Sequence, residues 1–134
     1  MRIGVPTEIK NREFRVGLVP DSVKELTARG HQVLVQSGAG AGIGSDDDTY
    51  RAAGAEIAPD AESVFANAEM IVKVKEPQEV EWKRLREDHI LFTYLHLAAA
   101  PELAVALQEA EIGAIAYETV QDGQGGFPLL APMS

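Results

Sequence analysis

The sequence predicts an α/β fold built on a mainly parallel sheet with helices on both faces. Short runs rich in β-branched residues alternate with helical runs along the chain. Repeated strand–helix–strand units favour parallel pairing, because each helix returns the chain to the start of the next strand. The 134 residues, 46% of them hydrophobic and 25% charged, suit one folded domain with a real core.

In the first half of the chain, turn and capping residues separate the expected elements. Pro6 ends a strand over 2–5, and a long loop without clear periodicity follows over 7–19. Pro20 opens a helix, Gly30 ends it, and Asp60 caps another. After the loop we expect a helix over 20–29, a strand over 31–36, a helix over 46–53, a strand over 55–58 and a helix over 60–67.

The second half continues the alternation. Pro77 and Pro101 each stand where a helix is expected to begin. Leu103 and Leu107 lie at helical spacing in the helix that Pro101 opens. The expected elements are a strand over 69–75, a helix over 78–86, a strand over 89–95, a helix over 101–111, a strand over 112–117, a turn over 121–126 and a return strand over 127–130.

The charge and the residue types exclude several classes of function. The net charge of −9 argues against a nucleic-acid or anionic-membrane partner, since these need a cationic surface. The absence of cysteine removes disulfides, thiolate metal sites and a cysteine nucleophile, and no other metal-binding spacing occurs. The most apolar stretch, 90–100, is too short to cross a bilayer. We therefore expect a soluble, cytoplasmic protein without a metal.

Four ionisable residues fall in the loop after the first strand or just after later strands, on the side where ligands bind to parallel sheets. They are Arg15, Lys75, His96 and Glu118. The Arg15 fork suits a carboxylate, although the alternative is a surface arginine paired with Glu8 or Glu13. His96 is either a general acid or base or a core histidine that contacts a backbone carbonyl. His31 and His89 are expected to be structural or exposed.

Lys73 and Lys75 lie two residues apart on one predicted strand, so both point to the same face. A buried charged pair would be unfavourable, and at least one lysine must reach solvent or a ligand. Ligand binding and solvation at the strand end remain equal alternatives for Lys75. For Lys73 we favour solvation.

The glycine loop, residues 38–44, follows a strand and precedes a helix, as a dinucleotide-binding loop does. Its glycines do not have the GxGxxG spacing, and Asp46, Asp47 and Asp48 would repel a pyrophosphate. We therefore interpret it as a structural turn. The domain is expected to be Rossmann-like but to lack a nucleotide fingerprint.

Several motifs, taken together, resemble the alanine dehydrogenases. They are RIGVPTEIKNREFRVGLVP, GHQVLVQSGAGAGIG, IVKVKEP, LFTYLHLAAAPEL, AIAYETVQ and PLLAPMS, and the likeness covers the whole chain in order. A more distant resemblance is to the first domain of the proton-translocating nicotinamide nucleotide transhydrogenases. The resemblance implies interconversion of L-alanine with pyruvate and ammonia, with NAD as cofactor, in a homo-oligomer that is usually a hexamer.

The resemblance also implies roles for individual residues. Arg15 and Lys75 would hold the carboxylate and carbonyl of the substrate, His96 would be the catalytic acid or base, and Ser134 would contact the cofactor. Tyr94 would line the pocket or belong to the core. An aspartate of a separate NAD-binding domain would complete the site, and it has no counterpart here.

The chain ends on an apolar segment, PLLAPMS, whereas most C-termini are polar. Residues 1–134 are therefore expected to be the N-terminal portion of a substrate domain, with an NAD-binding Rossmann domain after residue 134. The fragment alone is expected to be inactive. The alternatives are a non-catalytic module that binds keto acids and the N-terminal part of a transhydrogenase α subunit.

Overall fold

The computed structural model describes residues 1–93 and 101–116. Within these ranges the chain forms one six-stranded sheet with the order β3-β2-β1-β4-β5-β6, and every strand pairing in it is parallel. The strands are β1 (Arg2–Val5), β2 (Gln32–Gln36), β3 (Glu56–Ala58), β4 (Met70–Val72), β5 (Ile90–Thr93) and β6 (Gly113–Ala116). The predicted parallel α/β fold is confirmed.

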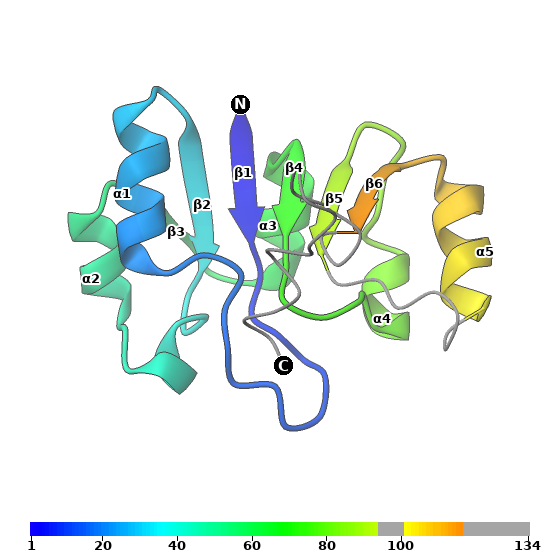
Figure 1. Ribbon diagram of the computed structural model, residues 1–134, viewed down its shortest axis with the longest axis horizontal. Helices are drawn as coiled ribbons and strands as arrows, with labels where there is room; N and C mark the ends of the chain where they lie inside the picture. The colour runs from blue at the N-terminus through cyan, green and yellow to red at the C-terminus, as the bar shows by residue number, and fades with distance from the viewer. Residues whose placement is uncertain (94–100, 117–134) are drawn as a thin grey trace, which may run out of the picture.

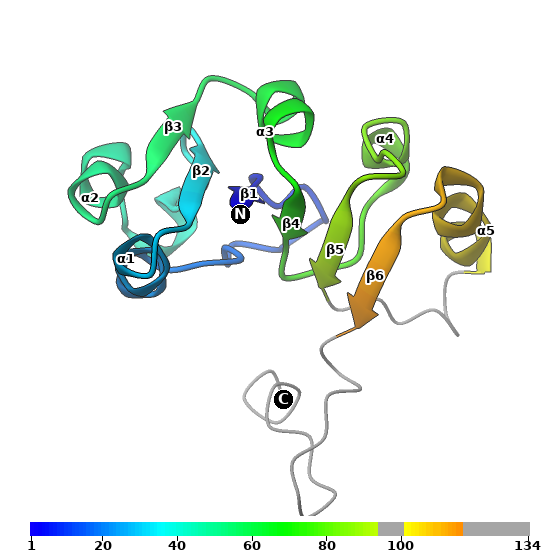
Figure 2. The ribbon, with the colours of Figure 1, turned by 90° about the horizontal axis from the view of Figure 1, so that it is seen from above.

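Helices cover both faces of this sheet (Figure 2). They are α1 (Pro20–Ala28), α2 (Asp47–Ala52), α3 (Ala61–Asn67), α4 (Glu79–Trp82) and α5 (Pro101–Ala110), and a short 3₁₀ turn, η1 (Ala41–Ile43), lies between β2 and α2. The first two α-helices lie on one face, and α3 and α5 lie on the other. None of the helices in the described ranges has the length and apolar composition that a membrane crossing requires.

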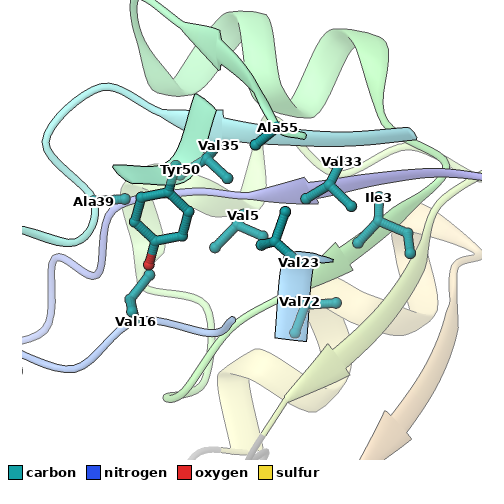
Figure 3. Packing of buried hydrophobic residues seen from close by; sticks show 10 residues of the cluster. All are labelled: Ile3, Val5, Val16, Val23, Val33, Val35, Ala39, Tyr50, Ala55 and Val72. Carbon is teal, nitrogen blue, oxygen red and sulfur yellow. The ribbon is translucent and has the colours of Figure 1, made fainter. Parts of the chain in front are cut away.

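Alternation along the strands divides the core in two. Val33 and Val35 of β2 point to one face, and Leu34 between them points to the other. Figure 3 shows the first cluster, in which Val23 of α1 and Tyr50 of α2 cover the valines and isoleucine of β1 and β2. The second cluster is formed by Ala58, Val64, Phe65, Ala68, Ile71, Leu85, Leu91, Leu103 and Leu107. A sheet buried on both faces explains why its strands are short apolar runs.

Side-chain caps set the starts of the short helices. Asp46 accepts a hydrogen bond from the Thr49 N–H at 2.8 Å, and Asp60 accepts one from the Ser63 N–H at 2.8 Å. These bonds satisfy N–H groups that have no partner within the helix. They also lower the pKa of both carboxyls, since they stabilise the charged form.

Two predicted elements are shorter than expected. The strand predicted over 69–75 extends only from Met70 to Val72, because β1 ends at Val5 and the chain turns away at Pro6. The helix predicted over 78–86 extends only from Glu79 to Trp82 and continues as i→i+3 turns. The turn and return strand predicted over 121–130 lie outside the described residues.

Candidate functional site

The candidate site lies at the carboxyl edge of the sheet, where the loop over residues 6–19 passes the end of β4 (Figure 1). β1 and β4 are neighbours at the point where the strand order reverses, and parallel sheets bind ligands in the crevice at this point. Gly17 allows the loop to lie against the strand end. A Cβ atom at Gly17 would come within 2.5 Å of the Val72 carbonyl oxygen, so any larger residue would push the loop away.

Lys75 is held through its backbone from two sides. Its N–H donates to Oε1 of Glu8 at 3.1 Å, and its carbonyl accepts from Oγ1 of Thr93 at 2.9 Å. Glu8 belongs to the loop after β1, whereas Thr93 is the last residue of β5. The peptide of Lys75 is therefore fixed between the two strands that neighbour β4, and its side chain is half-buried.

Arg15 pairs with Glu13, which was one of the two partners that the sequence offered. Nε of Arg15 lies 2.9 Å from Oε2 of Glu13, and NH2 lies 2.7 Å from Oε1. The Arg15 N–H also donates to Oε2 at 3.0 Å. Two parallel N–H···O contacts fix the plane of the guanidinium as well as its distance. Glu8, the other partner considered for Arg15, instead binds Lys73 and the backbone N–H groups of Val74 and Lys75.

The Glu13 carboxylate is stabilised in its charged form, chiefly by Arg15. The hydrogen bond from the Arg15 side chain lowers the pKa of Glu13, and the charges of Arg15 and Lys75 lower it further, against the opposing effect of burial. The structure brings the loop that carries Arg15 against the segment that carries Lys75, 60 positions away in the sequence, through the contacts of Glu8 and the close approach at Gly17.

Lys73 does not reach solvent, so the expectation of strand-end solvation is wrong. Its Nζ lies 3.2 Å from Oε1 of Glu8 and 3.3 Å from Oε2 of Glu81, and all three side chains are 1% exposed. We call these three residues the buried charge cluster. Two carboxylates compensate the ammonium that the sequence argument assumed to be unpaired.

Glu8 and Glu81 therefore belong to the site region, although the sequence did not single them out for it. A lysine at a buried strand position needs a carboxylate partner. This requirement was the signal in the sequence that could have pointed to Glu8 and Glu81. Which glutamate supplies it depends on the fold, because Glu8 lies 65 positions from Lys73. Glu81 is recognisable only as a helix residue, and its other oxygen accepts the Gln78 N–H in a capping box.

Four residues named by the sequence, Tyr94, His96, Glu118 and Ser134, lie outside the described ranges. Of the other histidines, His89 is fully buried and structural, as expected. Its Nε2 lies 2.7 Å from the Phe65 carbonyl oxygen, and its Nδ1 accepts the Arg86 N–H at 3.0 Å. Nε2 therefore carries the proton. Burial lowers the pKa of His89.

The glycine loop is closed by the chain's own groups. Asp47 accepts hydrogen bonds from the Gly38 N–H at 2.9 Å and from the Ser37 hydroxyl at 2.6 Å, and these two bonds lower its pKa. A Cβ atom at Gly42 would lie 2.1 Å from the Phe14 carbonyl oxygen. The loop thus packs against the segment that carries Arg15, and an internal carboxylate occupies an amide that a phosphate would need.

Comparison with known proteins identifies the relationship. A family model described as alanine dehydrogenase/PNT, N-terminal domain, matches residues 4–134. The chain belongs to this family. The resemblance that the sequence motifs indicated is confirmed for the alanine dehydrogenase/PNT N-terminal domain as a whole.

Relatives of this N-terminal domain are alanine dehydrogenases. One from Mycolicibacterium smegmatis is 53% identical over 134 residues, which are 100% of this chain and 36% of the relative. A solved L-alanine dehydrogenase superposes with a TM-score of 0.96 at 51% identity, over 99% of this chain and 37% of that one. A transhydrogenase from Sinorhizobium meliloti is more distant, with a TM-score of 0.82 at 28% identity over 88% of this chain and 35% of that one.

Proposed function

We propose that the chain is the N-terminal portion of the substrate domain of an NAD-dependent L-alanine dehydrogenase. The reaction converts L-alanine, NAD and water to pyruvate, ammonia and NADH. One observation carries the proposal: the loop that contains Arg15 is bonded through Glu8 to the peptide of Lys75 at the reversal point of the sheet. The chain spans only about a third of the length of the relatives it matches.

The arrangement suits a small α-keto acid. The half-exposed guanidinium of Arg15 is oriented by Glu13 and presents a fork that binds a carboxylate at two points. Lys75 would place an ammonium near it, where it would stabilise negative charge on the carbonyl oxygen during attack by ammonia. Together the two cations would hold both ends of pyruvate and so orient its carbonyl carbon.

His96 is proposed as the general acid or base. It follows β5 by three residues, and Thr93 at the end of β5 is bonded to the Lys75 carbonyl. A histidine near its ordinary pKa exchanges a proton efficiently at neutral pH. It would take up or return the proton that moves when the amine becomes an imine and the imine is hydrolysed.

NAD would accept the hydride from the Cα atom of alanine. The glycine loop does not fit this cofactor, since Asp47 already occupies the Gly38 amide. We propose that a Rossmann domain after residue 134 holds NAD, with Ser134 contacting it at the crossing, and that residues 1–134 belong to the substrate domain. A cytoplasmic homo-oligomer, usually hexameric in this family, is part of the same proposal.

The test is steady-state reductive amination of pyruvate by the full-length protein, followed by NADH absorbance. We expect His96→Ala to lower the turnover number about 10²- to 10⁴-fold with a smaller change in KM for pyruvate. Residues 1–134 alone are expected to be inactive. If His96→Ala kept near-normal turnover across the pH range, His96 would be a core histidine.

The same assay separates the alternatives. A non-catalytic module would bind pyruvate without oxidising NADH. A transhydrogenase subunit would need a second nicotinamide nucleotide and would not respond to alanine or ammonia. The lower identity to the transhydrogenase, 28% against 51% for the solved alanine dehydrogenase, favours the dehydrogenase.

A further inference from the structure

The buried charge cluster joins three parts of the chain. Glu8 lies in the loop that carries Arg15, Lys73 follows β4, and Glu81 lies in α4. The ammonium of Lys73 contacts both carboxylates, at 3.2 Å and 3.3 Å. The cluster lies directly beside the candidate site, because Lys73 is two residues from Lys75.

Glu8 has contacts that Glu81 lacks. Its Oε2 accepts the Val74 N–H at 3.0 Å, and its Oε1 accepts the Lys75 N–H at 3.1 Å as well as contacting Lys73. One side chain thus binds three consecutive residues after β4. The Glu8 carboxylate replaces the neighbouring strand that β1 no longer provides after Val5.

Burying three charged side chains has an unfavourable free energy that a purely structural contact would not require. Taking charged groups out of water carries a penalty of several kcal/mol per ion, and apolar residues of similar volume often stabilise a core as well or better. Burial raises the pKa of Glu8 even though Lys73 and two amides favour its charged form. A buried carboxylate that binds consecutive amides does, however, fix geometry to a degree that apolar packing does not.

We propose that Glu8 is a positioning residue that sets the spacing between Arg15 and Lys75. It anchors the Arg15 loop to Lys73, and with the same carboxylate it holds the peptide of Lys75. This inference rests on the proposed function, because the spacing matters only if both cations bind one substrate. Glu81 completes the charge balance around Lys73 and attaches α4, but it contacts neither the Arg15 loop nor Lys75 among the contacts described.

The test compares Glu8→Gln with Glu81→Gln in the full-length enzyme. Both variants remove one buried carboxylate from the same ammonium, so both are expected to lower thermal stability. Only Glu8→Gln is expected to raise KM for pyruvate, by about tenfold, since small misplacements of binding groups have large effects. Neither should change KM for NADH. Glu69→Gln is the exposed control, because Glu69 pairs with Arg2 at the opposite end of β1 and β4.

A merely structural role would reduce the fraction of active enzyme, which lowers apparent turnover but leaves KM for pyruvate unchanged. The proposal is therefore overturned if Glu8→Gln has the wild-type KM, or if Glu81→Gln raises KM equally. If Glu8→Gln does not fold, Glu8→Asp is measured under the same criterion, because it keeps the charge but shortens the reach. Absence of alanine-dependent NAD reduction in the wild-type protein would instead reject the proposed function.

Discussion

The carboxylate of Glu13 is nearly buried, with 6% of its side chain exposed, whereas the guanidinium it binds belongs to a side chain that is 46% exposed. The glutamate is thus the fixed member of the pair, and the arginine is the member that faces solvent. The two contacts, at 2.7 Å and 2.9 Å, fix the orientation of the guanidinium plane. An exposed cation with a fixed orientation is what recognition of a small anion requires.

Arg15→Lys tests this orientation. Lysine keeps the positive charge but cannot make the two-point contact, so Glu13 no longer fixes its direction. We expect KM for pyruvate to rise about 10- to 100-fold, which corresponds to one charge-assisted hydrogen bond of roughly 1.5–3 kcal/mol. Steady-state kinetics of the full-length enzyme measures this, with Arg2→Lys as an exposed control. An unchanged KM would leave Arg15 as a partner of Glu13 only.

The two lysines after β4 should respond differently to substitution by methionine. Lys73→Met leaves two buried carboxylates without their ammonium, and we expect a loss of about 3–5 kcal/mol in the free energy of unfolding. Lys75→Met should change stability by less than about 1 kcal/mol but lower turnover and raise KM for pyruvate. Urea denaturation and the amination assay on the same preparations provide both quantities. Equal stability losses would contradict the division of roles.

His89 should make stability depend on pH. Its pKa is lowered in the folded state, because a second proton would charge a buried ring and break the Nδ1 contact with the Arg86 N–H. The neutral ring therefore contributes its full stability above the unfolded pKa of about 6.5, and this contribution is lost as the pH falls toward the folded value. The slope is at most about 1.4 kcal/mol per pH unit for one proton.

Denaturation of wild type and His89→Gln between pH 8 and pH 5 measures this dependence. Glutamine offers a carbonyl acceptor and an NH₂ donor group but does not titrate in this range. We expect wild type to lose stability relative to the variant as the pH falls. If both lost stability in parallel, the dependence would come from other groups.

Gly42 and Gly44 offer a matched pair in the glycine loop. Gly42→Ala places a methyl group 2.1 Å from the Phe14 carbonyl oxygen, so the contact between the glycine loop and the Arg15 loop must shift. Gly44 has a φ of +77° with open space around it, and alanine there costs about 1–2 kcal/mol of local strain without displacing that loop. We expect only Gly42→Ala to raise KM for pyruvate.

KM for NADH should stay unchanged in both glycine variants, because the loop is proposed to bind no nucleotide. A structure of the full-length enzyme with NAD would test the same point directly. Backbone amides of Gly40 or Gly42 within hydrogen-bond distance of the pyrophosphate would contradict the assignment of this loop as a turn.

Local signals predicted the fold well. Proline and glycine at helix ends, capping aspartates and short β-branched runs indicated each helix and strand within the described residues. Errors occurred where tertiary contacts decide the boundary: β4 ends at Val72, beside the point where its neighbour β1 turns away after Val5. The site was predicted less completely. Arg15 and Lys75 stood out by type and position, whereas the partnership of Glu8 with Lys73 depends on a contact across 65 positions.

The central pairing of β1 with β4 has a consequence for the order in which the protein assembles. β1 and β2 are separated by one helix and its loops, so they can pair early, while β4 arrives only after most of the intervening chain has been synthesised. A chain that contains only β1 to β3 would carry the Arg15 loop without its contacts to Lys73, Val74 and Lys75. The geometry that would recognise the substrate is therefore complete only once the two halves of the sheet have joined through β1 and β4.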